Sequence, residues 1–263
     1  MSNIFDTNIL YPAYDSPLKE HFIDNFEAVF IAFSPFFLIG KAENRKAETQ
    51  IRSTKIITLS ELQKKYSIFK NIQLAADRLI YSSDNANYPT DDEILAYGKV
   101  VTWQYILENA GFKNLGEISL ALRTSIGALN KEFKTSHLIK VLDEFTIHNS
   151  IYHPVEGRIT ILSLIQIYHC LFAMKKFDIV IADEFFQDST TISLSTVTCS
   201  EFISKVKGYV YFFPTDKSIL FTIEWDSFFF LICGDQLSLD FIINNFDFEG
   251  FYCDSDTMHN WDL

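Results

Sequence analysis

The sequence predicts an α/β protein, more closely an α+β fold, with a mixed β-sheet that ends in an antiparallel meander and is covered by several amphipathic helices. Helical periodicity dominates the first 150 residues, whereas short aromatic and β-branched runs separated by turn residues dominate the later part. Of the 263 residues, 48% are hydrophobic and 26 are Phe, which provides for a sizeable core. No linker intervenes, so we expect one domain over residues 1–263, helix-rich to about 150 and acidic α/β from about 151.

In the helix-rich part, "EAVFIAFSPFF" predicts an early buried strand that ends at Ser34-Pro35. The basic, polar stretch 41–55 predicts a loop or surface helix, and Thr58 or Ser60 can cap a helix over 60–69. Thr90 to Glu93 has the form of a capping box, opening a helix that runs to about Ala110 and stops at Gly111. Two amphipathic helices follow, within 115–133 and 136–148.

In the acidic part, residues 159–174 are apolar nearly all round and predict a buried helix. Its thin polar stripe includes His169, which we interpret as a core histidine. A buried strand over 179–182 precedes a helix beginning near Ser200. Three strands follow, separated by turns at 214–217 and 225–226, and then a helix over 235–246 and a short final strand.

The charge is unevenly divided along the chain. The net charge is −12, and residues 151–263 hold 6 Lys and Arg against 16 Asp and Glu. From 218 to 263 there is no Lys or Arg, while nine acids occur. Such a field repels nucleic acid and attracts a basic protein partner, although a solvated face that aids solubility is the alternative. The residues expected to bind this partner are Asp247, Glu249, Asp254 and Asp256.

The C-terminal segment also contains an incomplete set of metal ligands. Cys253, Asp254, Asp256 and His259 are residue types that bind zinc, and the two carboxylates alternate as in a calcium loop. One cysteine and one histidine do not complete a motif. We therefore favour an acidic segment whose aromatic residues pack on the sheet and whose carboxylates stay outside, and we expect no metal and no cofactor.

A weaker hypothesis is catalysis. Asp183 and Glu184 follow a predicted strand and could form an acid/base pair, but adjacent strand residues point to opposite faces. His153 and Glu156 precede the buried helix, where Glu156 also suits the positive helix end. A metal-assisted hydrolase that uses these four residues with His259 is the alternative to a non-enzymatic interaction protein, such as an immunity or antitoxin-type neutraliser.

Several classes are excluded or disfavoured. No nucleophile elbow, P-loop or Rossmann glycine fingerprint is present. A helix-turn-helix around Gly111, with Arg123, Thr124, Ser125 and Asn130 facing DNA, lacks a basic face. The longest apolar runs fall short of the roughly 20 residues that span a bilayer, and no signal peptide is recognisable, so we expect a cytoplasmic protein without membrane contact. The four cysteines form no C-x-x-C pair, and the oligomeric state stays open.

Four stretches between about Trp103 and Trp261 are distinctive: "RTSIGALNKEF", "HPVEGRITILSL", "FDIVIADEFF" and the closing run from "IEWDSFFFLICG" to "CDSDTMHNW". In these stretches the chain resembles an uncharacterised bacterial family of unknown function, family 2711. The resemblance implies a bacterial cytoplasmic protein with one α/β domain and no established activity, and it supplies no catalytic residues.

Overall fold

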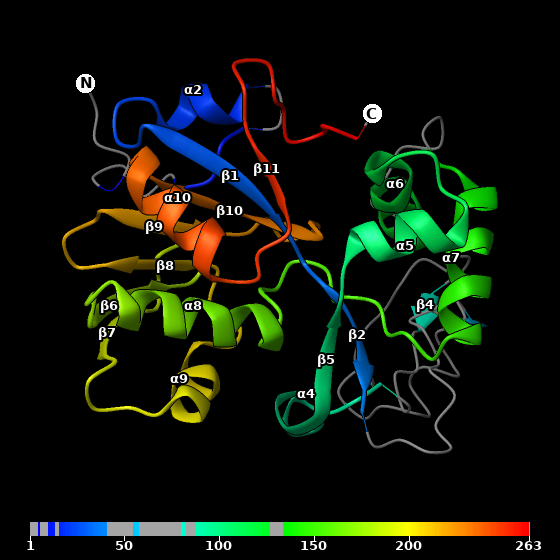
Figure 1. Ribbon diagram of the computed structural model, residues 1–263, viewed down its shortest axis with the longest axis horizontal. Helices are drawn as coiled ribbons and strands as arrows, with labels where there is room; N and C mark the ends of the chain where they lie inside the picture. Colours follow the sequence, from blue (N-terminus) through cyan, green and yellow to red (C-terminus); the bar gives the residue numbers. More distant parts are fainter. Residues whose placement is uncertain are drawn as a thin grey trace.

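The computed structural model describes residues 5, 10–13, 16–40, 55–57, 80–82, 88–126 and 134–262. Within these ranges the chain forms eight helices and eleven strands, which confirms the α+β class. Figure 1 shows a large twisted sheet with helices against it, and a second group of helices beside it. None of the described helices is both long and apolar enough to cross a membrane.

The large sheet has seven strands in the order β11-β1-β10-β9-β8-β6-β7. Consecutive strands β8, β9 and β10 are neighbours, as the predicted meander requires. Every pairing among the described strands is antiparallel, so the mixed sheet that we expected contains no parallel pair here. The strands are β1 (Ala28–Phe33), β6 (Asp178–Ala182), β7 (Ser189–Ser193), β8 (Tyr211–Pro214), β9 (Ile219–Thr222), β10 (Phe229–Gly234) and β11 (Gly250–Tyr252).

Both faces of this sheet are covered, which explains why all six residues of β1 are buried. Alternate residues of the strand enter two different cores: Val29 and Ile31 one, Phe30 and Ala32 the other. The Phe30 core is completed by helices α8 (Ile161–Ala173), α9 (Cys199–Val206) and α10 (Gln236–Asn245). The Val29 core is completed by α2 (Leu18–Phe22), α5 (Trp103–Ala110), α6 (Leu115–Ile126) and α7 (Ser136–His148).

The single helix expected from Thr90 to Ala110 is wrong, because a strand divides it. The helix α4 (Asp91–Tyr97) begins with the predicted capping box, and α5 ends at Gly111, whose φ of 87° is left-handed as expected. Between them β5 (Gly98–Val101) pairs with β2 (Phe36–Ile39). Gly98, Val100 and Val101 are poor helix formers, and the antiparallel partner provides the alternative hydrogen bonds. Thr102 then caps α5.

The helix α2 and the strand β2 were not predicted, and the other elements match their predicted places with three further differences. His169 is exposed on α8 and is not a core histidine. The polar strand β7 was not predicted, because "STTIS" has too few apolar residues to mark a strand. A further pair of short strands, β3 (Lys55–Ile57) and β4 (Ile80–Ser82), was also not predicted. The loop or surface helix predicted over 41–55 lies outside the described residues except for Lys55, which begins β3, and the helix predicted over 60–69 lies outside them entirely.

Candidate functional site

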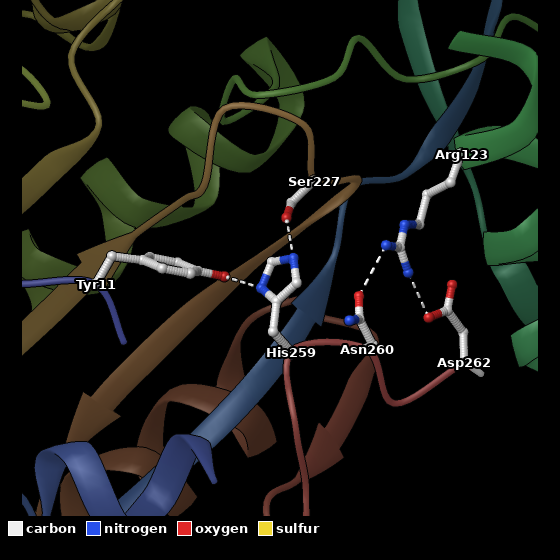
Figure 2. A network of polar contacts seen from close by, with 6 residues as sticks. All are labelled: Tyr11, Arg123, Ser227, His259, Asn260 and Asp262. Carbon is white, nitrogen blue, oxygen red and sulfur yellow. Dashed lines mark hydrogen bonds and ion pairs between the residues drawn. The ribbon is translucent and has the colours of Figure 1, made fainter. Parts of the chain in front are cut away.

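The most connected buried polar network is built by the segment that follows β11. His259 lies between two hydroxyl groups: Tyr11 Oη is 2.9 Å from its Nδ1, and Ser227 Oγ is 3.3 Å from its Nε2 (Figure 2). The imidazole is only 1% exposed. Burial, with a smaller contribution from the charge of Arg123, lowers the pKa of His259 to about 3. The imidazole is therefore neutral at physiological pH, and one of its nitrogens donates a hydrogen bond.

Next to it, Arg123 of α6 binds the same segment twice. Its Nη1 donates to Asp262 Oδ1 at 2.6 Å and its Nη2 donates to Asn260 Oδ1 at 2.8 Å (Figure 2). The side chains of Arg123 and Asp262 are 7% and 1% exposed. Arg123 and Thr124 are buried and do not face solvent as a DNA reader requires, which agrees with the sequence argument against a helix-turn-helix. One expectation is corrected here: Asp262 is not an external carboxylate.

The contact between Ser227 and His259 resembles the pairing of a nucleophile with its base, but the surroundings favour a structural role. Both residues are only 1% exposed, so a substrate has no direct access to the serine oxygen. Of the aromatic residues predicted to pack on the sheet, Trp261 packs against Phe251 and Phe33, whereas Tyr252 is exposed. The network therefore fixes the C-terminal segment against the sheet and α6.

The four candidate metal ligands of this segment do not converge. Cys253 is buried, and burial raises the pKa of its thiol to about 12. Asp254 and Asp256 are exposed and form a local turn in which Asp254 Oδ1 accepts from the Asp256 N–H at 2.9 Å. His259 is held in the network above. Among the described residues, no group of three or more His, Cys, Asp or Glu side chains could hold a metal ion.

The candidate catalytic residues also lie apart from His259, on other elements. Asp183 accepts hydrogen bonds from three backbone N–H groups and so organises the loop between β6 and β7, from which Glu184 points to solvent. His153 is 2% exposed, and its Nε2 is 2.9 Å from Thr146 Oγ1 of α7. Burial lowers the pKa of His153 to about 3. Glu156 is half-buried in the loop before α8.

Among the residues expected to bind a partner, Glu249 has a structural role that was not predicted. Its carboxylate accepts hydrogen bonds from the backbone N–H groups of Trp103, at 2.5 Å, and Gln104, at 2.6 Å. It thus caps the N-terminus of α5 from 145 residues away in the sequence. Burial raises the pKa of Glu249. No local pattern in the sequence marks such a distant cap. Asp247, close by, is exposed.

Asp254 and Asp256 lie instead near the end of the sheet where β1 begins and β10 and β11 end, and other acids join them there. Glu27 accepts from the N–H of Gln236 at the start of α10, and the hydroxyl of Tyr252 donates to Asp240 at 2.7 Å. These contacts bring three separate segments together. The acids at this end are Asp24, Glu27, Asp235, Asp240, Asp254 and Asp256.

Large apolar side chains are exposed among these acids. The exposed fractions are 82% for Leu237, 66% for Ile23, 40% for Phe241 and 38% for Tyr252. We call the six acids and these four residues the acidic–apolar end. In Figure 1 the start of α10 and the turn after α2 lie at the upper left of the sheet, and β11 ends at its top. The arrangement combines negative charge with apolar area that the fold itself does not bury.

Comparison with known proteins places the chain in a family without an assigned activity. Residues 14–263 match the family described as "Protein of unknown function (DUF2711)", and the chain belongs to this family. The chain is also similar to an uncharacterised protein, YwbB, of Bacillus subtilis strain 168. The identity is 25% over 174 residues, which are 66% of this chain and 77% of that protein. No solved structure matches the chain.

Proposed function

We propose that the protein is a non-enzymatic interaction module that binds a basic, amphipathic segment of a partner protein at the acidic–apolar end. The observation that carries this proposal is the convergence of six acids and four exposed apolar side chains from three segments. Exposed apolar patches that are rimmed by polar residues often mark sites of protein–protein interaction.

The chemistry of the surface specifies the chemistry of the partner. A negative field draws a positively charged partner and raises its association rate, and apolar contact supplies affinity once the two surfaces meet. Residues 218–263 contain no Lys or Arg that would weaken this negative field. Lys19, from the N-terminal part of the chain, is a positive charge close to Cys253. A helix with leucines along one face and lysines along the other matches both components.

The direct test uses a synthetic amphipathic peptide of this kind and measures its dissociation constant by fluorescence anisotropy. We expect binding to weaken about tenfold between about 50 and about 300 mM salt. The double variant Asp24→Asn/Asp256→Asn should weaken binding about fivefold at low salt, since rim charges act mainly through attraction over distance. Leu237→Ser, at a residue 82% exposed, should weaken binding without lowering thermal stability.

The matched control is Glu108→Gln/Glu144→Gln, which removes two exposed acids from α5 and α7 and changes the net charge by the same amount. It should leave peptide affinity within about twofold of the original protein. Equal losses in both double variants would show that the peptide responds to net charge alone. That result, or binding that is insensitive to Leu237→Ser, contradicts the proposal. No observation on the described residues favours the alternative of a metal-assisted hydrolase.

A further inference from the structure

The opposite end of the sheet carries two loops that lie close together. Ala182 pairs with Tyr211, and Tyr211 pairs with Thr222, so β6, β8 and β9 are in register at this end. The loop after β6 and the turn after β9 therefore leave the sheet with one strand between them, about 10 Å apart. Each places an aromatic residue directly after a glutamate: Glu184-Phe185 in the loop and Glu224-Trp225 in the turn.

The loop after β6 is rigidly built, although its aromatic tip is exposed. The Asp183 carboxylate accepts from the backbone N–H groups of Phe185, Gln187 and Asp188 at 2.9 to 3.2 Å. Phe186 adopts a φ of 53° and stacks on Tyr211 at 5.2 Å. Phe185 is 72% exposed in spite of this order. Because the loop is already ordered, less conformational entropy is lost when a ligand binds to the exposed phenylalanine.

The turn after β9 is fixed in a similar way. Gly157 donates its N–H to Ser227 O at 2.9 Å, and its α-carbon packs directly against the backbone of Trp225. Ser227 in turn donates its N–H to Glu224 O at 3.2 Å. Trp225 is nevertheless 62% exposed. The two most exposed aromatic side chains among the described residues thus sit on ordered loops at one end of the sheet.

Within the described part of the chain, the two glutamates beside these aromatic residues have no positively charged partner. Among the described residues, no Lys or Arg forms an ion pair with Glu184 or Glu224. Burial raises the pKa of Glu224 to about 7, and the nearby charges of Asp226 and Glu184 add to this effect. Burial, with smaller contributions from the charges of Glu224, Glu184 and Asp183, raises the pKa of Tyr211 to about 12. Repulsion of this kind is relieved when a cation binds.

We propose that this end of the sheet is a second binding site, which receives an arginine side chain of a partner protein between Glu184 and Glu224, with Phe185 and Trp225 as stacking faces. Arginine fits better than lysine because its planar guanidinium can bind carboxylates with several N–H groups and stack on an aromatic ring at the same time. The site shares no residue with the acidic–apolar end, so it does not depend on the function proposed above.

The test follows the indole N–H of Trp225 by ¹H–¹⁵N NMR during titration with the peptide acetyl-Gly-Arg-Gly-Arg-Gly-amide. The chain has three tryptophans, and Trp225→Phe assigns the resonance. We expect the Trp225 indole and the amides of residues 183–188 and 224–227 to shift, while the indole of buried Trp103 stays in place. Glu184→Gln and Glu224→Gln should each weaken binding about tenfold, and the double variant further.

Two comparisons keep this test specific. The peptide with citrulline in place of arginine has the same shape without the charge and should cause no shift. Asp24→Asn/Asp256→Asn, at the opposite end of the sheet, should leave the Trp225 shifts unchanged, which separates this site from the function proposed above. The inference is overturned if the arginine peptide leaves Trp225 unshifted at millimolar concentration, if the citrulline peptide shifts it equally, or if both glutamine variants bind as well as the original protein.

Discussion

The guanidinium of Arg123 in α6 and the carboxylate of Asp262, in the segment after β11, form an ion pair of 2.6 Å that is almost completely buried. It joins the helix-rich part of the chain to the C-terminal part across 139 residues of sequence. Because both charges are removed from water, each depends on the other for stabilisation. The pair therefore links the two parts energetically as well as spatially.

Arg123→Met should lower the free energy of unfolding by about 3 to 5 kcal/mol, because it leaves the carboxylate of Asp262 buried without its cation. Urea unfolding followed by tryptophan fluorescence measures this loss. The double variant Arg123→Met/Asp262→Asn should be more stable than the sum of its single variants predicts. Additive losses would show that the two side chains do not interact energetically. The exposed pair of Lys140 and Glu144 is the control, and its removal should cost less than about 1 kcal/mol.

The lowered pKa of buried His259 predicts that the protein loses stability in acid. Its pKa is about 3 in the folded protein and 6.5 in the unfolded chain, so the unfolded chain binds more protons between these values. Stability from this residue is complete above pH 6.5 and is lost as the pH falls towards 3. At pH 5 the loss should be about 2 kcal/mol.

The measurement compares the original protein with His259→Gln by urea unfolding at pH 7 and pH 5. Between pH 7 and pH 5, the free energy of unfolding should fall by about 2 kcal/mol less in the variant than in the original protein. His137→Gln, at an exposed position on α7, is the matched control for the replacement of a histidine by glutamine. Equal pH dependence for His259→Gln and the original protein contradicts the prediction.

The outcome for β5 and Glu249 shows where sequence reasoning reached its limit. Caps and turns depend on neighbouring residues, and so the capping box at Thr90, the left-handed Gly111 and the β8–β10 meander could all be predicted. The strand β5 depends on a partner, β2, about 60 residues earlier in the chain, and periodicity carries no information about it. Tertiary pairing overrides local propensity at such points.

The candidate site was harder to predict than the fold, for a physical reason. The sequence marks Asp254 and Asp256 as acids but cannot show that Asp24 and Glu27, more than 200 residues away, join them. It also cannot separate an acid that caps a helix from an acid that faces solvent, as with Glu249. Surfaces assembled from distant segments become visible only once the strand order is known.

Glu249→Gln separates capping from partner binding. The amide keeps one acceptor oxygen but loses the negative charge that two backbone N–H groups share, so we expect a loss of about 1 to 2 kcal/mol in unfolding free energy. Affinity for the basic amphipathic peptide should not change. Asp247→Asn is the matched control. Because Asp247 is exposed, this substitution should lower the free energy of unfolding by less than about 0.5 kcal/mol. A loss of peptide affinity without a loss of stability would reverse this assignment.

Gly157→Ala tests whether the turn that presents Trp225 is held by close backbone contact. Gly157 has a φ of 65°, and a Cβ there would overlap the carbonyl of Trp225. Gly111 has a similar φ of 87° but open space around it, so Gly111→Ala measures the cost of the backbone conformation alone, about 1 kcal/mol. Gly157→Ala should lower the free energy of unfolding by at least about 2 kcal/mol and should shift the Trp225 indole resonance. Equal costs at the two positions would argue against the contact.

Glu224 predicts the opposite pH dependence from that of His259. Its pKa is about 7 in the folded protein and 4.5 in the unfolded chain, so the folded protein binds more protons between these values. Stability therefore falls as the pH rises from about 4.5 to about 7, and the cost persists above pH 7. Because the side chain is half-buried and solvent screens its charge, Glu224→Gln should raise the unfolding free energy at pH 8 by about 1 to 2 kcal/mol, less than the full pKa shift implies, whereas at pH 4 the gain should vanish. Urea unfolding at the two pH values measures both gains, and a gain that is the same at pH 4 and pH 8 would show that burial of charge at Glu224 is not the cause.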